Sequence, residues 1–134
     1  MSLYDLYATD PDMETGGIIL EYGEGVRVKI ARAGGANASF AKTLERLSRP
    51  YRKRLDTGTL DDETASNLFT RVFAEAVVLD WEGVTDREGN ELPYNADNCV
   101  AVFKDLPDFF ADVRDAATTV SNYRAEEIEE DVKN

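Results

Sequence analysis

The feature that most constrains this fold is an amphipathic segment in the middle of the chain. Six apolar side chains recur there at positions i, i+3, i+4, i+7, i+8 and i+11: Ala65, Leu68, Phe69, Val72, Phe73 and Ala76. This spacing places all six on one face of an α-helix. The preceding Thr59-Leu60-Asp61-Asp62 resembles a capping box that begins such a helix. We therefore predict a core helix here, against which the other elements pack.

The next stretch, Val77 to Asp97, reads as a structural joint. The helix is expected to run on towards Trp81, the sole tryptophan, and an acidic turn follows at residues 86–89. Asn95 then provides an N-cap for a further helix. Trp81 is expected to pack between the helices that flank it. Nothing in the stretch is a nucleophile.

The N-terminal half predicts a β-hairpin. Residues 18–22 and 26–30 are two strand-like runs, the second of which alternates apolar and basic side chains around Val28 and Ile30. Gly23-Glu24-Gly25 between them is a short turn. A lone hairpin is marginal in water, so it must pack on helices or on another chain. Residues 1–16, which are acidic and rich in tyrosine, are expected to form an extended arm.

Further helices are predicted on both sides of the core helix. One begins after Gly34-Gly35, capped by Asn37 or Ser39, is interrupted by Pro50 and ends at Gly58. Proline lacks the amide hydrogen that an α-helix needs, so a kink or a split is expected. Another helix begins at Pro107. The prediction is a single domain over residues 1–134, of α+β class and mainly α-helical, with about four helices and an N-terminal β-hairpin. Residues 124–134 form an acidic tail that we expect to fray.

The net charge of −12 is unevenly distributed. Residues 1–25 carry six acidic and no basic side chains, residues 26–58 carry two acidic and nine basic ones, and residues 59–134 carry nineteen acidic and six basic ones. A basic island in an acidic chain indicates either two complementary surfaces or a solvated charged face. Complementary surfaces would favour a homo-oligomer built by head-to-tail contacts.

The inventory of reactive groups predicts a protein that is not an enzyme and that needs no cofactor. Histidine is absent and Cys99 is the only cysteine, so neither an imidazole base nor a cysteine zinc site is available. The spacing of Asp86, Glu88 and Asn90 partly resembles that of a calcium-binding loop. However, Gly89 stands at the fourth position of this loop instead of the sixth. Cys99 is expected to be a small buried hydrophobic group. With no secretory leader or membrane helix in view, we expect a soluble intracellular protein.

The candidate partner-binding residues are basic or apolar. The basic ones belong to the island, and a thin apolar stripe in the acidic tail provides the others: Lys42, Arg49, Arg52, Lys53, Arg54, Ile128 and Val132. The pI of about 4.4 disfavours nucleic acid as the partner. An acidic protein is the favoured partner for the basic run.

Several short motifs resemble one family of proteins. They are Arg49-Pro50-Tyr51-Arg52, Asp80-Trp81-Glu82-Gly83-Val84, Asp86, Gly89, Leu92-Pro93-Tyr94, Asn98 and Leu106-Pro107-Asp108-Phe109. Together they look like the tail assembly chaperones of long-tailed (siphovirus-type) bacteriophages, over about residues 40–123. The motifs are packing signatures without catalytic content.

The resemblance implies a helper protein of tail assembly. Such a protein coats the tape measure protein, prevents its aggregation and recruits tail tube protein subunits in the host cytoplasm, and it is absent from the mature virion. Two other classes remain open. One is a virion structural protein, such as a tail completion or head–tail connector subunit, and the other is an acidic inhibitor that mimics DNA.

Overall fold

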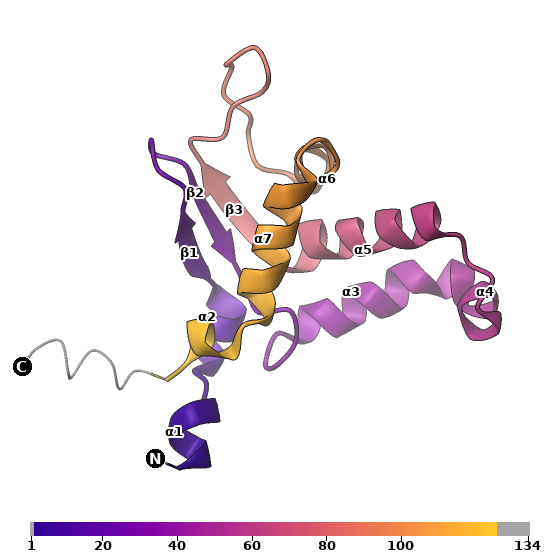
Figure 1. Ribbon diagram of the computed structural model, residues 1–134, viewed down its shortest axis with the longest axis horizontal. Coiled ribbons are helices and arrows are strands. Elements are labelled where there is room, and N and C mark those ends of the chain that lie inside the picture. The colour runs from indigo at the N-terminus through magenta and orange to yellow at the C-terminus, as the bar shows by residue number, and fades with distance from the viewer. Residues whose placement is uncertain (1, 126–134) are drawn as a thin grey trace, which may run out of the picture.

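The computed structural model describes residues 2–125, and within them it confirms a mainly helical α+β fold (Figure 1). The elements follow in the order α1 Leu3–Tyr7, α2 Pro11–Gly16, β1 Ile18–Glu21, β2 Arg27–Ile30, α3 Ala38–Ser48, η1 Arg49–Tyr51, α4 Arg52–Thr57, α5 Asp62–Ala76, β3 Val78–Glu82, α6 Ala96–Asp105, α7 Pro107–Thr118 and η2 Val120–Tyr123. The two η elements are single 3₁₀ turns. Three of the α-helices, α1, α2 and α4, are only five or six residues long.

The predicted hairpin is confirmed and forms part of a three-stranded antiparallel sheet of order β1-β2-β3. Glu24 at its turn has a positive φ of 53°, between two glycines that also have positive φ. The third strand corrects the prediction that the central helix runs on towards Trp81. Helix α5 ends at Ala76, and the chain continues at once as β3.

A β-bulge explains why β3 does not show the alternation of a strand. Lys29 pairs with Asp80 and Ile30 pairs with Val78, so Leu79 is the extra residue. Leu79 and Asp80 both face outwards, whereas Val78 and Trp81 face the core. The burial pattern therefore departs from the period of two by which a strand is recognised in a sequence.

Trp81 is buried, but not between two helices as predicted, because it lies on a strand. Its indole ring meets the ring of Tyr94 edge-to-face at 5.0 Å between centroids. The indole N–H donates to the carbonyl of Leu92 at 2.8 Å. The Tyr94 hydroxyl in turn lies 2.5 Å from the carbonyl oxygen of Ala74 and 2.9 Å from that of Val78. The stretch after β3 is thereby fastened to both α5 and the sheet.

The core lies between the inner face of the sheet and helices α5, α6 and α7. Its fully buried members include Val28, Ile30, Phe73, Val77, Cys99, Phe103, Val113 and Ala117. Helix α5 is thus the core helix that its periodicity predicted. Its N-cap is Asp61, whose carboxylate accepts from the amide of Thr64 at 3.0 Å, and not Thr59 as the capping-box pattern predicted.

Residues 3–16 are largely helical, which corrects the prediction of an extended arm. Ser2 and Asp5 form a capping box at α1, and Asp10 caps α2, which begins with Pro11. The amide of Asp10 donates to the carbonyl of Tyr123 in η2 at 2.8 Å. Glu14 of α2, only 2% exposed, forms an ion pair with Arg32. The N-terminal segment is therefore fastened to the three-stranded sheet and helices α6, α7 and η2, which together with it form what we call the body.

Residues 38–76 form what we call the arm. Helices α3 and α5 lie side by side and extend away from the sheet, with α4 at the far end (Figure 1). Pro50 splits α3 from α4 as predicted, and Gly58, with φ of 68°, ends α4. Asn37 stands before α3, but its amide group donates to the carbonyls of Arg32 and Ala76, at 2.8 and 2.9 Å. This buried side chain joins both helices of the arm to the body.

The remaining helix starts agree with the sequence. Asn95 caps α6 by accepting from the amide of Asn98 at 2.7 Å, and Pro107 opens α7. Among the described residues, none of the helices is long and apolar enough to span a membrane.

Candidate functional site: two grooves on helices

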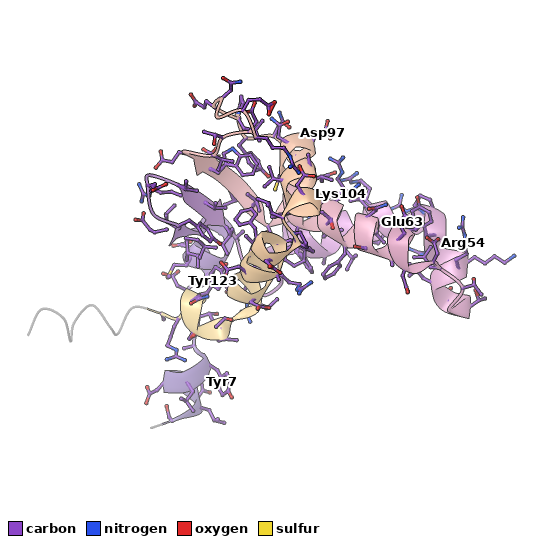
Figure 2. All side chains as sticks on the ribbon, turned by 45° about the horizontal axis from the view of Figure 1, so that its top comes forward. Tyr7, Arg54, Glu63, Asp97, Lys104 and Tyr123 are labelled. Carbon is purple, nitrogen blue, oxygen red and sulfur yellow. The ribbon has the colours of Figure 1, made fainter. Side chains whose placement is uncertain are left out.

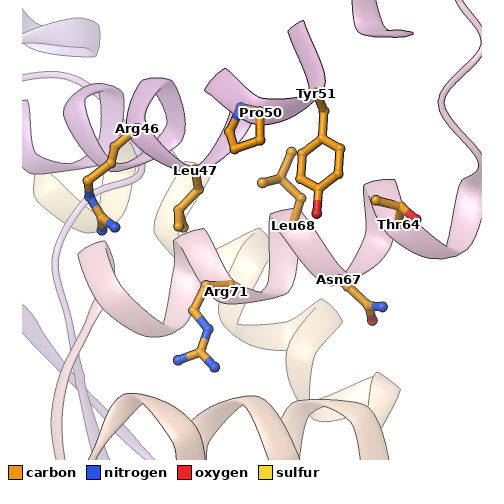
Figure 3. Close-up of a pocket in the computed structure, with 8 residues that line it drawn as sticks. All are labelled: Arg46, Leu47, Pro50, Tyr51, Thr64, Asn67, Leu68 and Arg71. Carbon is orange, nitrogen blue, oxygen red and sulfur yellow. The ribbon is translucent and has the colours of Figure 1, made fainter.

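The first groove, which we call the arm groove, runs between α3–η1 and α5. It has a volume of about 430 Å³. Figure 3 shows Leu47, Pro50 and Tyr51 on one side of it and Leu68 of α5 facing them. The remaining lining residues are polar: Arg46, Thr64, Asn67 and Arg71. The groove thus has an apolar floor with a guanidinium group on each wall, one from each helix.

Ion pairs hold the two arginines of the arm groove in place. Arg46 lies 2.5 Å from a carboxylate oxygen of Glu75, and Arg71 lies 3.8 Å from the other oxygen of the same group. Arg71 also contacts Asp97 of α6 at 2.9 Å. A guanidinium offers five N–H donors, so these contacts leave donors available for a further acceptor. The groove can therefore accept an apolar side chain together with an acidic one.

The predicted basic residues lie on the arm but do not line its groove. Lys42, Arg49, Arg52, Lys53 and Arg54 are all exposed on α3, η1 and α4. Arg54 stacks over the Tyr51 ring at 5.6 Å. These residues surround the groove, so their role in binding a partner stays a prediction. Ile128 and Val132 lie outside the described residues.

Part of this basic surface is neutralised within the arm. Arg49 and Arg52 contact the two carboxylate oxygens of Glu45 at 2.5 and 2.9 Å. The hydrogen bond from Arg49 is the main cause that lowers the pKa of Glu45, and Arg52 adds to it. The arm as a whole, residues 38–76, carries seven basic and six acidic side chains, in a chain whose net charge is −12. The arm is therefore less repulsive to an acidic partner than the rest of the chain taken together.

The second groove, which we call the loop groove, lies between residues 84–92 and helix α6. Its volume is about 540 Å³, and five apolar residues line it: Val84, Leu92, Ala101, Val102 and Leu106. The rim carries Asp86, Glu88 and Asp105 together with a single base, Arg87, which lies 3.6 Å from Asp105. The sequence revealed the acidic turn. The apolar floor could not be read from the sequence, because it forms only where residues 84–92 fold against α6.

The reactive groups of the described residues include one thiol, that of Cys99. No cluster of three or more metal-ligating side chains occurs in this part of the chain. Cys99 is fully buried, as predicted, and burial raises the pKa of its thiol to about 12. A thiol with such a pKa is almost entirely protonated at neutral pH, so this group is a poor nucleophile.

These observations define a small α+β protein whose most prominent surface features are two open, partly apolar grooves on helices. The model of the YdaY prophage protein family matches residues 35–134, and the chain therefore belongs to this family. The protein is thus phage-related. No curated protein and no solved structure matches the chain. The matched segment contains both grooves, whereas α1, α2 and the hairpin precede it.

Proposed function

We propose that this protein is a non-catalytic assembly chaperone of phage tails, which binds the tape measure protein and keeps it soluble in the host cytoplasm. In this proposal it also helps to recruit tail tube subunits and is absent from the mature virion. Membership of a prophage family supports the phage setting. The motifs that resemble tail assembly chaperones support the specific role, and they include Trp81, Leu92 and Tyr94, which the structure places in one packed cluster.

The observation that carries the proposal is the arm groove. A tape measure protein is a long helical protein with apolar faces, which would aggregate if they stayed exposed. An amphipathic helix can lay its apolar face on Leu47, Tyr51 and Leu68, while an acidic side chain pairs with Arg46 or Arg71. Copies that also contact one another would bind along one tape measure with avidity.

The proposal is tested by expressing the tape measure protein of the same phage with and without this chain. The expected result is a larger soluble fraction of the tape measure protein and its co-purification with the chain. Equal solubility in both cultures, without co-purification, would overturn the proposal. Recovery of the chain from purified virions would favour the alternative of a tail completion or head–tail connector subunit.

A matched pair of variants tests whether the arm groove is the contact. Tyr51→Ala removes a ring that lines the groove, and Leu55→Asp changes an exposed neighbour that does not line it. Removing an aromatic anchor from an interface weakens binding by about tenfold or more. We expect this loss for Tyr51→Ala only, with both variants retaining the wild-type circular dichroism spectrum. Equal binding by both variants would move the contact away from the groove.

A further inference from the structure

We propose that the tip of the arm of one copy docks into the loop groove of a second copy, which gives a head-to-tail assembly. The tip is defined as Arg52, Lys53, Arg54 and Leu55 of α4. This inference stands on surfaces other than the arm groove and does not depend on the proposed function. It assigns a partner, a second copy of this chain, to two surfaces that carry complementary charges and exposed leucines.

The tip presents an apolar side chain that follows three basic residues and precedes one acidic residue, Asp56. Leu55 is 45% exposed on a helix of six residues at the far end of the arm. Its three preceding neighbours are all basic, and Figure 2 shows Arg54 extending from the end of the arm. Arg52 is paired with Glu45, whereas Arg54 stacks on Tyr51 and keeps its charge at the surface.

The loop groove presents the opposite arrangement, an apolar floor surrounded by negative charge. Leu106 at its floor is 55% exposed, although the groove is wide enough to take a further apolar side chain. Three carboxylates and one guanidinium stand on the rim, and Arg87 is already paired with Asp105. Insertion of Leu55 would cover Leu106, and Lys53 and Arg54 would meet Asp86 and Glu88. Apolar burial and charge complementarity thus favour the same contact.

An arm tip that fills the loop groove must come from another copy, because the tip cannot reach the groove of its own chain. Helix α5 has fifteen residues and therefore separates the tip from the body by about 22 Å. Asn37 and the Arg71–Asp97 ion pair fix the base of the arm to the body. In Figure 1 the tip lies at the far end of the arm, whereas helix α6 lies beside α7 near the base of the arm. A contact between two unlike surfaces continues from copy to copy until a ring closes.

The tip adjoins the arm groove, because Arg54 stacks on the ring of Tyr51, but the two surfaces do not share the docked side chain. Leu55 is absent from the lining of the arm groove. Docking of one leucine side chain buries little surface area, so the assembly should be weak and should depend on protein concentration. Because the charges are exposed, salt should weaken it further.

The test uses the full chain in sedimentation velocity at low salt, without tape measure protein. The wild type should form species larger than a dimer at high concentration. Leu55→Asp disables the tip and Leu106→Asp disables the groove, so each variant alone should stay monomeric. An equal mixture retains one working tip and one working groove, so it should form a dimer and nothing larger. Both residues are exposed, and unchanged circular dichroism confirms that each variant is folded.

A charge exchange provides a second, independent test. Arg54→Glu should reduce the assembly, and mixing it with Glu88→Arg should restore a contact between the two variants. The inference is overturned if the wild type is monomeric, or if either leucine variant assembles as the wild type does. It is also overturned if the mixture of the two leucine variants stays monomeric or grows beyond a dimer. Failure here leaves co-purification with the tape measure protein unaffected, so the two proposals fail separately.

Discussion

The body and the arm of this protein are held together by different kinds of contact. In the body, side chains distant in sequence interlock, and polar atoms such as the indole N–H of Trp81 bond to backbone carbonyls. In the arm, α3 packs on α5, and the outer surface carries exposed ion pairs such as those of Glu45 with Arg49 and Arg52. Buried contacts between distant residues dominate stability, whereas exposed ion pairs contribute little. The difference indicates that the body provides stability and that the arm presents a surface.

The same contrast appears between two ion pairs. Glu14 in the body is 2% exposed and pairs with Arg32, whose side chain is 21% exposed. Glu45 on the arm is exposed and pairs with Arg49 and Arg52, which are exposed as well. A charge removed from the buried pair leaves its partner poorly solvated. The exposed pair can exchange its partners for water at small cost.

The largest effect on the body is expected from Trp81→Ala. The loss of a buried tryptophan ring leaves a cavity and an unpaired Leu92 carbonyl, which should lower the free energy of unfolding by about 3–5 kcal/mol. Urea denaturation followed by far-UV circular dichroism measures this change. Leu79→Ala is the matched control, because this neighbour on β3 faces outwards and should cost less than about 1 kcal/mol. Similar losses for both variants would refute the placement of Trp81.

The second expected effect is the loss of the buried ion pair in Glu14→Gln. Burial opposes ionisation of Glu14, but hydrogen bonds from Arg32 and Thr9 outweigh it and hold the pKa of this carboxyl below its ordinary value of 4.5. Glutamine cannot accept from Arg32 as a carboxylate does, so the variant should lose about 2 kcal/mol of unfolding free energy at neutral pH.

The pH dependence of stability sharpens the same test. A carboxyl with a lowered folded-state pKa stabilises the protein fully above its unfolded pKa, and this contribution is lost as the pH falls through the folded value. The difference between wild type and Glu14→Gln should therefore be constant near neutral pH and shrink below about pH 4.5. A difference that grew on acidification would contradict the assignment. Glu45→Gln on the arm is the control and should leave the melting temperature unchanged.

The third prediction concerns the seam of the arm. Phe69 of α5 is 38% exposed and packs on Phe73 at 5.0 Å between ring centroids. Because part of its ring is already in water, Phe69→Ala should cost about 1–2 kcal/mol, less than Trp81→Ala. Thermal unfolding by circular dichroism provides the comparison. A loss as large as that of Trp81→Ala would mean that the arm is as essential to stability as the body.

The smallest effect on stability is expected from Lys42→Glu combined with Arg49→Glu. Both side chains are exposed, Lys42 on α3 and Arg49 on η1, so the melting temperature should stay close to that of the wild type. If the basic face of the arm meets the tape measure protein, the variant should associate more slowly and show a weaker salt dependence. Surface plasmon resonance at two ionic strengths measures both quantities. Unchanged kinetics would exclude this face from the interface.

Much of the fold was readable from the sequence because local signals agreed with the tertiary structure. The hairpin, the core helix α5, the split at Pro50 and the Asn95 cap each follow from a residue type that has a specific backbone role. Strand β3 was missed because the bulge at Leu79 removes the alternation that marks a strand. Helices α1 and α2 were missed because they are too short for a periodic pattern, although Ser2, Asp5 and Asp10-Pro11 carried their capping signals.

The grooves were harder to predict than the elements that form them. Leu47, Tyr51 and Leu68 fall at helical spacing, and a pattern cannot distinguish a side chain in the core from one that lines an open groove. Arg46 and Arg71 are far apart in sequence, and only the packing of α3 on α5 brings them to one site. The basic residues chosen from the sequence lie on the arm but do not line its groove, and their role in binding stays a prediction.

Tryptophan fluorescence reports on the body of the protein and hardly on the arm, because the single tryptophan lies in the sheet. Trp81 packs against Tyr94, and the arm contains no indole of its own. Intrinsic fluorescence excited at the indole band would therefore follow the opening of the sheet and report little when α3 separates from α5. Circular dichroism responds to both regions. The gap between a fluorescence curve and a dichroism curve would thus measure how independently α3 and α4 can separate from α5 while the core stays intact.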